Sequence, residues 1–436
     1  MKLNQPLLTA IALALCYTSL QANGIYDNGT GARSMAMGGA DVAWASDPLG
    51  AMAVNPAALA FQTTGPALNL GGVGGFLNGH YQKGDLVSGN LDTQPQALPE
   101  GAFAMPIGKL PIVIGLSFVP EAMDLANWNY GDTPGTQGVS YGAQNDKSEI
   151  ISLRSALGIA GQVTSNFSMG ASVGLIYNKN EMDSPYIFQN LSSNPAADGA
   201  KTTLNLQTEG LGWNAQVGFL YKVTPDVQIG LSYESPTKIV STGDAWGNPS
   251  AQFGANLPFH YDATVTNTLP QEVRGGVSWK ITPQWRLSTQ VDWIDWSDAF
   301  KDLPLSFRNG SNSTVNSVLG SSFNESIPLN WKSQFVYRAG VDYEVIKGLD
   351  LRAGYCYGSS PVPDSTLTPL TAAIFQNTVT CGVGYHWDRY RVEAAYQYYL
   401  PSTQSVSQSD LRAGEYSSST TTVSAHEFAL TTTVEF

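Results

Sequence analysis

From residue 66 to the C-terminus, apolar and polar residues alternate in segments of roughly 8 to 12 residues, and the connections between segments are alternately short and long. A period of two is the pattern of a strand with one apolar and one polar face. Outer-membrane barrels have short turns at one end and long loops at the other, whereas a soluble sandwich has no reason to sort its connections in this way. The pattern therefore predicts an all-β fold, a transmembrane antiparallel β-barrel.

The alternating segments predict fourteen strands, and an even number is what a closed bacterial barrel requires. The strands are expected near residues 66–76, 99–106, 111–119, 150–160, 167–177, 211–222, 226–239, 270–281, 284–296, 333–344, 349–358, 377–387, 389–399 and 425–436. Short turns include 164–166, 224–226, 282–284, 347–348 and 387–389, and long loops are expected near 77–98, 120–149, 178–210, 240–269, 297–332, 359–376 and 400–424.

This arrangement predicts a place in the outer membrane of a Gram-negative bacterium. Both termini should face the periplasm, and the long loops should face outward. The surroundings of the barrel would then be outer-membrane lipid and lipopolysaccharide.

The last strand has two distinct faces. Its apolar face carries Phe428, Leu430 and Phe436, whereas Glu427 and Glu435 lie on the opposite face. A strand that ends on Phe resembles the assembly signal of outer-membrane proteins, which implies the barrel-assembly machinery as a partner through Phe436.

Residues 1–22 have the features of a secretory signal peptide: Lys2, an apolar run over 7–15, and a small-residue cleavage site ending at Ala22. The apolar run is shorter than the ~20 residues that a spanning helix needs. Removal of this segment leaves Cys356 and Cys381. Alternation places the first in the lumen and the second toward lipid, so both should remain thiols.

The charge of the chain also limits its partners. Charged residues make up 13% of the sequence, about half of the ~25% typical of soluble domains. The net charge is −13, and no basic patch is present, so nucleic acid is excluded as a partner.

Residues 23–62 lack the period-two alternation and are rich in Gly, Ala and Met. They contain a run at 31–40 that includes Gly38 and Gly39, followed by Asn55-Pro56-Ala57. Together with motifs at 230–236, 269–276, 282–297 and 351–364, these residues resemble the FadL/TodX family of outer-membrane transporters. The likeness spans nearly the whole mature chain, except for the long loops.

The resemblance implies an N-terminal hatch over 23–62 that plugs a fourteen-stranded barrel over 63–436. It also implies passive transport of hydrophobic molecules, foremost long-chain fatty acids, by capture on the loops, binding in the lumen, hatch movement and lateral release. The alternatives are an aromatic-hydrocarbon channel and a surface adhesin or receptor on a barrel scaffold. The protein is expected to act as a monomer without a cofactor.

Two interpretations of the hatch motif remain open. Asn55, Pro56 and Ala57 form either a rigid turn that couples ligand binding to hatch movement or a turn that only packs the plug. Gly38 and Gly39 are expected to allow close backbone packing in the lumen.

A fatty acid would need a lumenal guanidinium, because Arg binds carboxylates through two parallel hydrogen bonds. Alternation places four arginines on the lumen face: Arg154, Arg274, Arg338 and Arg352. The competing interpretation, which we favour for any single Arg, is that each pairs with a lumenal acid such as Glu272 or Asp342.

Apolar residues within the predicted long loops are candidates for a capture groove. They form two clusters, Tyr186, Ile187, Phe188 and Leu191 in one, and Phe253, Leu257, Phe259 and Tyr261 in the other. An exposed apolar patch marks an interaction site, although loop-on-loop packing explains such residues equally well.

The strand at 111–119 corresponds to the kinked strand of the family. Pro111, Gly115 and Pro120 favour a local defect in the wall, since proline removes a ladder donor and glycine permits a bend.

No catalytic motif is present, and the four histidines, His80, His260, His386 and His426, lack metal-ligand spacing. The sequence therefore predicts a protein that is not an enzyme and has neither catalytic residues nor a metal site.

Overall fold

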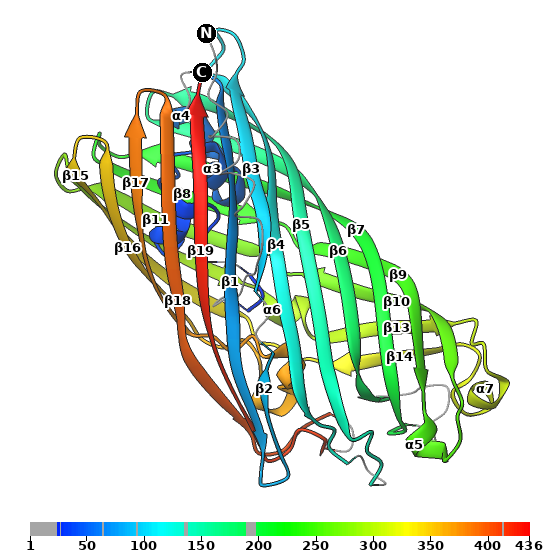
Figure 1. Cartoon of the computed structure of the whole chain (residues 1–436). Coiled ribbons are helices and arrows are strands. Elements are labelled where there is room, and N and C mark those ends of the chain that lie inside the picture. The colour runs from blue at the N-terminus through cyan, green and yellow to red at the C-terminus, as the bar shows by residue number, and fades with distance from the viewer. Residues whose placement is uncertain are drawn as a thin grey trace, which may run out of the picture.

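The computed structural model describes residues 24–26, 28–62, 65–92, 95–134, 138–188, 198–411 and 414–436. The predicted signal peptide lies outside these residues. Strands form one antiparallel sheet that closes when β1 (Ala67–Lys83) pairs with β19 (Ser419–Glu435) (Figure 1). Among the described residues, no helix has both the length and the apolar character needed to cross a bilayer.

The barrel has the fourteen strand positions that the sequence predicts. β1 takes the first position, and in three later positions two consecutive short strands, joined below by "with", take one position together. In chain order the remaining positions are taken by β2 (Val87–Leu91) with β3 (Gln96–Pro106), β4 (Ile112–Gly131), β5 (Ala143–Thr164), β6 (Phe167–Ile187), β7 (Lys201–Lys222), β8 (Val227–Glu234) with β9 (Thr237–Asn248), β10 (Phe259–Leu269) with β11 (Glu272–Lys280), β12 (Trp285–Ile294), β15 (Gln334–Ile346), β16 (Leu349–Gly358), β17 (Asn377–Trp387), β18 (Tyr390–Val406) and β19.

Strand pairing continues beyond the barrel wall on one side. β13 (Asp302–Arg308) and β14 (Phe323–Pro328) form a hairpin, and β13 pairs with the outer part of β10. The short helices α5 (Ser250–Phe253) and α7 (Ser313–Leu319) lie at the same end in Figure 1. The 3-10 helices η2 (Asp364–Thr366) and η3 (Pro369–Thr371) lie between β16 and β17.

The two ends of the barrel differ as predicted. At the end where the C-terminus lies, named here the turn end, strands are joined by short connections such as 165–166, 347–348 and 388–389 (Figure 1). The opposite end, the loop end, carries the longer connections. Several expected loops are wrong in extent, however, because 77–98, 178–210 and 240–269 are largely strand. In β10, for example, Phe259 and Tyr261 are buried while the outward positions are polar, so the apolar outer face typical of a membrane strand is missing although the backbone stays paired.

The two faces of the strands match the predicted alternation. On β19, Phe428 and Leu430 are 53% and 52% exposed, whereas Glu427 is fully buried on the lumen face. Cys356 is buried and Cys381 exposed, and both are free thiols, which confirms the prediction. An apolar exterior with a polar interior is the arrangement of an outer-membrane barrel.

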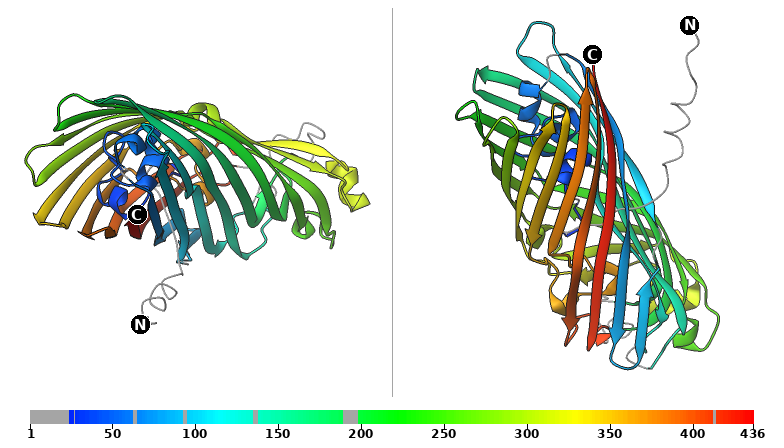
Figure 2. Two further views of the ribbon diagram at one scale, coloured as in Figure 1. Left: turned by 90° about the horizontal axis from the view of Figure 1, so that it is seen from above. Right: turned by 60° about the vertical axis from the view of Figure 1, so that its left-hand side comes forward.

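Residues 24–62, named here the N-terminal segment, lie inside the barrel (Figure 2). The segment contains α2 (Ala32–Ala36), α3 (Pro48–Val54), η1 (Pro56–Ala58) and α4 (Leu59–Gln62). It packs directly on the strand backbone where lumen-facing positions are glycine. A Cβ at Gly340, for example, would clash with the Met37 carbonyl. Small residues on both surfaces thus make room for the segment.

We expect Gly340→Val to loosen the N-terminal segment while leaving the barrel assembled. The added side chain would meet the Met37 backbone, and overpacking of this kind costs about 1–3 kcal/mol. Gly275→Val is the matched control, since a Cβ there would approach only Leu231, at 3.9 Å. Limited proteolysis in detergent should cleave the segment faster in Gly340→Val alone, and equal cleavage rates would contradict this packing account.

Candidate functional site

The Asn-Pro-Ala motif anchors the N-terminal segment to the barrel wall. The side chain of Asn55 donates to the carbonyls of Val42 at 2.7 Å and Phe219 at 3.1 Å, and it accepts from Ala57 N at 3.1 Å. Pro56 begins η1, where it needs no hydrogen-bond donor. The motif therefore has a packing role that its contacts explain, and its role in movement stays a prediction.

Gly38 and Gly39 form the turn after α2. Their φ angles are 65° and 74°, in the left-handed region that favours glycine. A Cβ at Gly38 would lie 3.0 Å from the backbone of Tyr355, and one at Gly39 would lie 2.5 Å from Arg338 Nη1. Both positions therefore need glycine for backbone conformation and for close approach to the wall, as the sequence predicts.

Three of the four predicted lumenal arginines are neutralised by acids. Arg338 Nε lies 2.6 Å from Asp292 Oδ2. Arg352 contacts the carboxylates of Asp342, Asp350 and Glu393 at 2.9–3.1 Å. Arg274 is paired with the carboxylates of Glu234 and Glu272. Such pairs offset the cost of burying the charges, which leaves these arginines structural partners within the wall.

Arg154 is different. Its side chain is 1% exposed, and its hydrogen-bond partners are neutral: Asn214 Oδ1 and Ser172 Oγ at 3.0 Å, and the Met52 carbonyl at 3.5 Å. The Glu121 and Glu234 carboxylates are near enough to interact with its charge, and Asn214, which accepts from Arg154 Nε, donates to Glu234 Oε1 at 2.6 Å. Met52 belongs to α3, so this guanidinium joins the β5 wall to the N-terminal segment near the helix C-terminus, where a cation is favoured.

A small polar cavity separates the N-terminal segment from the wall beside β4, β8 and β11. Its volume is about 70 Å³, well below the ~300–1,000 Å³ typical of ligand pockets. Tyr26, Glu121, Glu234, Glu272 and Arg274 contribute to its lining. Burial, reinforced by the nearby Glu121 and Glu234 carboxylates, raises the pKa of Tyr26 well above its usual value. The cavity has room for water but not for a long apolar chain.

A larger apolar region fills the lumen toward the loop end. It is a buried cluster, named here the lumenal apolar cluster, whose aromatic members include Trp128, Trp296, Phe300, Trp331, Phe375 and Tyr399. Ile25 of the N-terminal segment belongs to it, and Tyr26 packs against it. Sequence reasoning missed this cluster because Phe300, Trp331 and Phe375 lie in connections that fold back into the barrel, where no strand pattern identifies them.

The predicted capture residues are mostly buried in a second cluster near the loop end. Phe188, Phe259 and Tyr261 are 2%, 4% and 1% exposed, and Tyr186 and Leu257 pack against them. Ile187 is also buried, Phe253 is 43% exposed, and Leu191 lies outside the described residues. Phe259 and Tyr261 belong to β10 rather than to a loop. Packing between extended strands accounts for these contacts, and the capture role stays a prediction.

The wall is irregular along β4. The β4–β5 register shifts between Pro120 and Ala122. On the other side, β3 pairs with β4 through residues 113–118, and β2 pairs again only at 128–129, so no described residue of β2 or β3 pairs with 119–126. Met123 N in this interval donates to the Ile25 carbonyl at 2.9 Å.

The three residues predicted to mark the kink have different places in this wall. Pro111 precedes β4, and Pro120 lies at the register shift. Gly115 stays in the regular ladder, opposite Ala104 and Gly158, and a Cβ there would lie 2.7 Å from Met52 Sδ. The bend therefore centres on Pro120, and Gly115 makes room for the N-terminal segment.

Buried charges tie three connections together at the loop end. Lys201 Nζ, 1% exposed, donates to the carboxylates of Asp132 and Glu415 and to the Thr133 carbonyl at 2.6 Å. Burial raises the pKa of Glu415, and the nearby Lys201 opposes that shift. The sequence offered no signal for this cluster, because its members are far apart in the chain.

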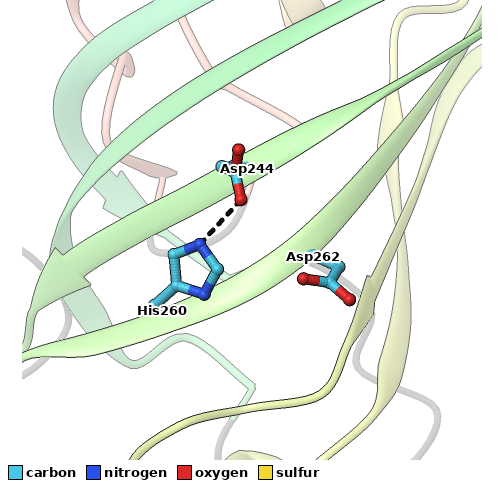
Figure 3. Close-up of side chains that lie close together, drawn as sticks. All are labelled: Asp244, His260 and Asp262. Atoms are coloured by element: carbon cyan, nitrogen blue, oxygen red, sulfur yellow. Dashed lines mark hydrogen bonds and ion pairs between the residues drawn. The ribbon is translucent and has the colours of Figure 1, made fainter.

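One histidine does meet acidic neighbours. His260 Nε2 lies 2.7 Å from Asp244 Oδ1 across the β9–β10 ladder, and Asp262 is close by (Figure 3). The three side chains offer ligand atoms within 4.8 Å of one another, but Asp262 also accepts from Asn309 at 2.6 Å. The sequence analysis missed this grouping because it depends on cross-strand register, and the exposed side chains are satisfied by one another and by Asn309.

Comparisons with known proteins agree with this architecture. The family model for outer membrane protein transport protein (OMPP1/FadL/TodX) matches residues 13–436. A long-chain fatty acid transport protein of Escherichia coli O6:H1 is 24% identical over 313 residues, which span 64% of this chain and 66% of the relative, just under two thirds of its length.

Two solved structures share the fold. A Pseudomonas aeruginosa FadL homologue superposes with a TM-score of 0.75 at 17% identity, covering 95% of this chain and 100% of the other. The Pseudomonas putida toluene transporter TodX gives 0.76 at 20% identity, with the same coverage. With the family model matching nearly the whole sequence, the chain belongs to the OMPP1/FadL/TodX family of outer membrane transport proteins.

Proposed function

We propose that this protein is a passive outer-membrane transporter of hydrophobic molecules and that its main substrates are long-chain fatty acids. The single observation that carries the choice of substrate is Arg154, a buried guanidinium whose hydrogen-bond partners are all neutral. A carboxylate would replace a weak carbonyl contact with a charge-assisted hydrogen bond. The other three lumenal arginines already have acidic partners and are poorer candidates.

The proposed path begins at the loop end. An apolar solute leaves the outer surface, enters the lumenal apolar cluster and brings its carboxylate toward Arg154. This guanidinium donates a hydrogen bond to the Met52 carbonyl of α3 at 3.5 Å. A bound carboxylate therefore competes with the N-terminal segment for the guanidinium. Ligand binding and release of the segment are thereby coupled.

Release is proposed to be lateral, through the irregular wall at β4. Backbone groups in the 119–126 interval lack a strand partner from β2 or β3, and Ile25 covers one of them, Met123 N. Withdrawal of Ile25 would expose this interval to a departing solute. An apolar molecule would then enter the membrane without crossing water.

This function assigns a role to each part of the chain. Residues 24–62 act as the hatch, residues 63–436 form the barrel, and both termini lie in the periplasm. The protein acts as a monomer, and Phe436, 66% exposed at the end of β19, presents the assembly signal.

Aromatic hydrocarbons are the second candidate substrate class. The solved relatives include toluene transporters, and aromatic rings dominate the lumenal apolar cluster. Such substrates would have no use for Arg154. A surface adhesin has less support, because it needs neither a filled lumen nor an interrupted wall.

Arg154→Gln should lower the affinity for oleate by roughly 10- to 100-fold, since a hydrogen bond to a charged group contributes about 1.5–3 kcal/mol. Uptake of toluene, which carries no charge, should not change. Arg389→Gln, at an exposed turn, is the matched control. Saturation binding of labelled oleate to purified protein measures the effect, and an unchanged affinity would exclude Arg154 as the carboxylate partner.

A disulfide between Ile25→Cys and Met123→Cys should block transport by holding the N-terminal segment on β4. The two backbones share a hydrogen bond, and both residues line one cavity, which places the two positions next to each other. With Cys356 and Cys381 replaced by Ser, oxidised cells should lose oleate uptake and reduced cells should regain it. The single variant Ile25→Cys controls for the substitution, and full uptake by the oxidised double variant would rule out release through this interval.

Deletion of residues 23–61 should abolish selective uptake but leave the barrel assembled, because the strand ladder closes through β1 and β19 without the segment. Heat-modifiable migration in gels reports assembly, and oleate uptake reports function. Failure of the truncated chain to insert would mean that the segment is needed for folding rather than for gating.

A further inference from the structure

Trp331 lies in a connection that turns back into the lumen between β14 and β15. Its backbone N donates to the Phe300 carbonyl at 3.1 Å, and the next residue, Lys332, donates to the Pro361 carbonyl at 2.8 Å. These bonds hold the connection against two others, and the Trp331 side chain is only 3% exposed. The indole is therefore fixed inside the lumenal apolar cluster.

Three rings form the centre of that cluster and are named here the aromatic triad: Trp296, Phe300 and Trp331. The centroid of Trp331 lies 4.7 Å from Phe300 and 5.2 Å from Trp296, and Trp296 lies 5.1 Å from Phe300. Contacts of this kind are favourable for any aromatic side chain at position 331. Packing alone therefore does not require an indole there.

The indole N–H of Trp331 is also unusual for its surroundings. Buried Trp N–H groups usually have a hydrogen-bond acceptor. Trp128 donates to the Pro369 carbonyl at 2.8 Å, and Trp296 donates to Gln334 Oε1 at 2.9 Å. Trp331 Nε1 has no acceptor among the described residues. Of the three tryptophans in the described part of this cluster, Trp331 alone thus has a buried indole N–H that the protein itself does not satisfy.

The N-terminal segment occupies space beside the triad. The Tyr26 ring lies 5.2 Å from Trp296, and Gly24 packs so closely on Trp296 that a Cβ would lie 2.6 Å from its ring. Movement of residues 24–26 would free one side of the triad for an apolar ligand. An acceptor on that ligand could then meet the unsatisfied donor.

We propose that Trp331 Nε1 donates a hydrogen bond to the bound substrate, so that the lumen selects apolar molecules with a hydrogen-bond acceptor over plain hydrocarbons. The inference rests on the proposed transport function and narrows its substrate class. A site built around a buried donor rejects analogues that lack the acceptor, because the donor then stays unpaired. Arg154 distinguishes charged from neutral ligands, whereas an indole N–H donates to the oxygen of a neutral ester or alcohol as well as to a carboxylate.

The test compares methyl oleate with 1-octadecene, two long neutral chains of which only the first has an acceptor. Radiolabelled probes are bound to the full-length protein in nanodiscs, and partition into empty nanodiscs is subtracted. The wild type should favour the ester, and Trp331→Phe should reduce that preference roughly threefold to tenfold, as loss of one neutral hydrogen bond predicts. Trp213→Phe, at a 69% exposed position on the outer face of β7, should keep the preference.

Thermal unfolding separates this role from a structural one. Trp331→Phe removes an unsatisfied polar group and should unfold no earlier than the wild type, whereas Trp128→Phe should unfold earlier. The proposal is overturned if the wild type binds 1-octadecene as tightly as methyl oleate, or if Trp331→Phe keeps the ester preference. The proposed fatty-acid function fails by a different result, equal binding of oleate and methyl oleate.

Discussion

Every backbone N–H and C=O group that faces lipid must be paired within the protein, because the hydrocarbon offers no water to replace a missing partner. The β1–β19 ladder meets this requirement by closing the sheet, and the rest of the architecture depends on that closure. Side chains then divide between a lipid face and a lumen. The lumen needs a filling, which the N-terminal segment and the inward connections supply.

The same constraint makes the wall at β4 informative. A register shift at Pro120 and a missing partner along 119–126 are costly in a membrane unless another group covers them. Ile25 does so in part, which links the position of the N-terminal segment to the integrity of the wall. Arg154 links that segment to the β5 wall through the Met52 carbonyl. Under the proposed function, binding and release would influence each other without a large change in the barrel.

The sequence predicted the features that depend on local alternation and failed where distant residues meet. The faces of β19, the lumenal position of Arg154 and the separate faces of Cys356 and Cys381 follow from a period of two. Charge complementarity also predicted that lumenal arginines pair with acids such as Glu272. It did not predict which Arg would have only neutral hydrogen-bond partners.

Other features depend on tertiary placement that no local pattern records. Trp331 lies in what reads as an ordinary long loop, and its burial follows from a chain reversal into the lumen. The ion cluster around Lys201 joins segments more than 200 residues apart, since Glu415 is 214 residues away in the sequence. The outer parts of β9 and β10 were read as loop because their outward residues have lost the apolar signal while the backbone remains paired.

The most direct test of the account is uptake of labelled oleate and labelled toluene by cells that lack their own transporter, with and without this protein. The account predicts saturable uptake of oleate that depends on the protein, since the lumen combines an apolar cluster with a guanidinium, that of Arg154, whose hydrogen-bond partners are neutral. Uptake of toluene without uptake of oleate would contradict it and would assign the chain to hydrocarbon transport.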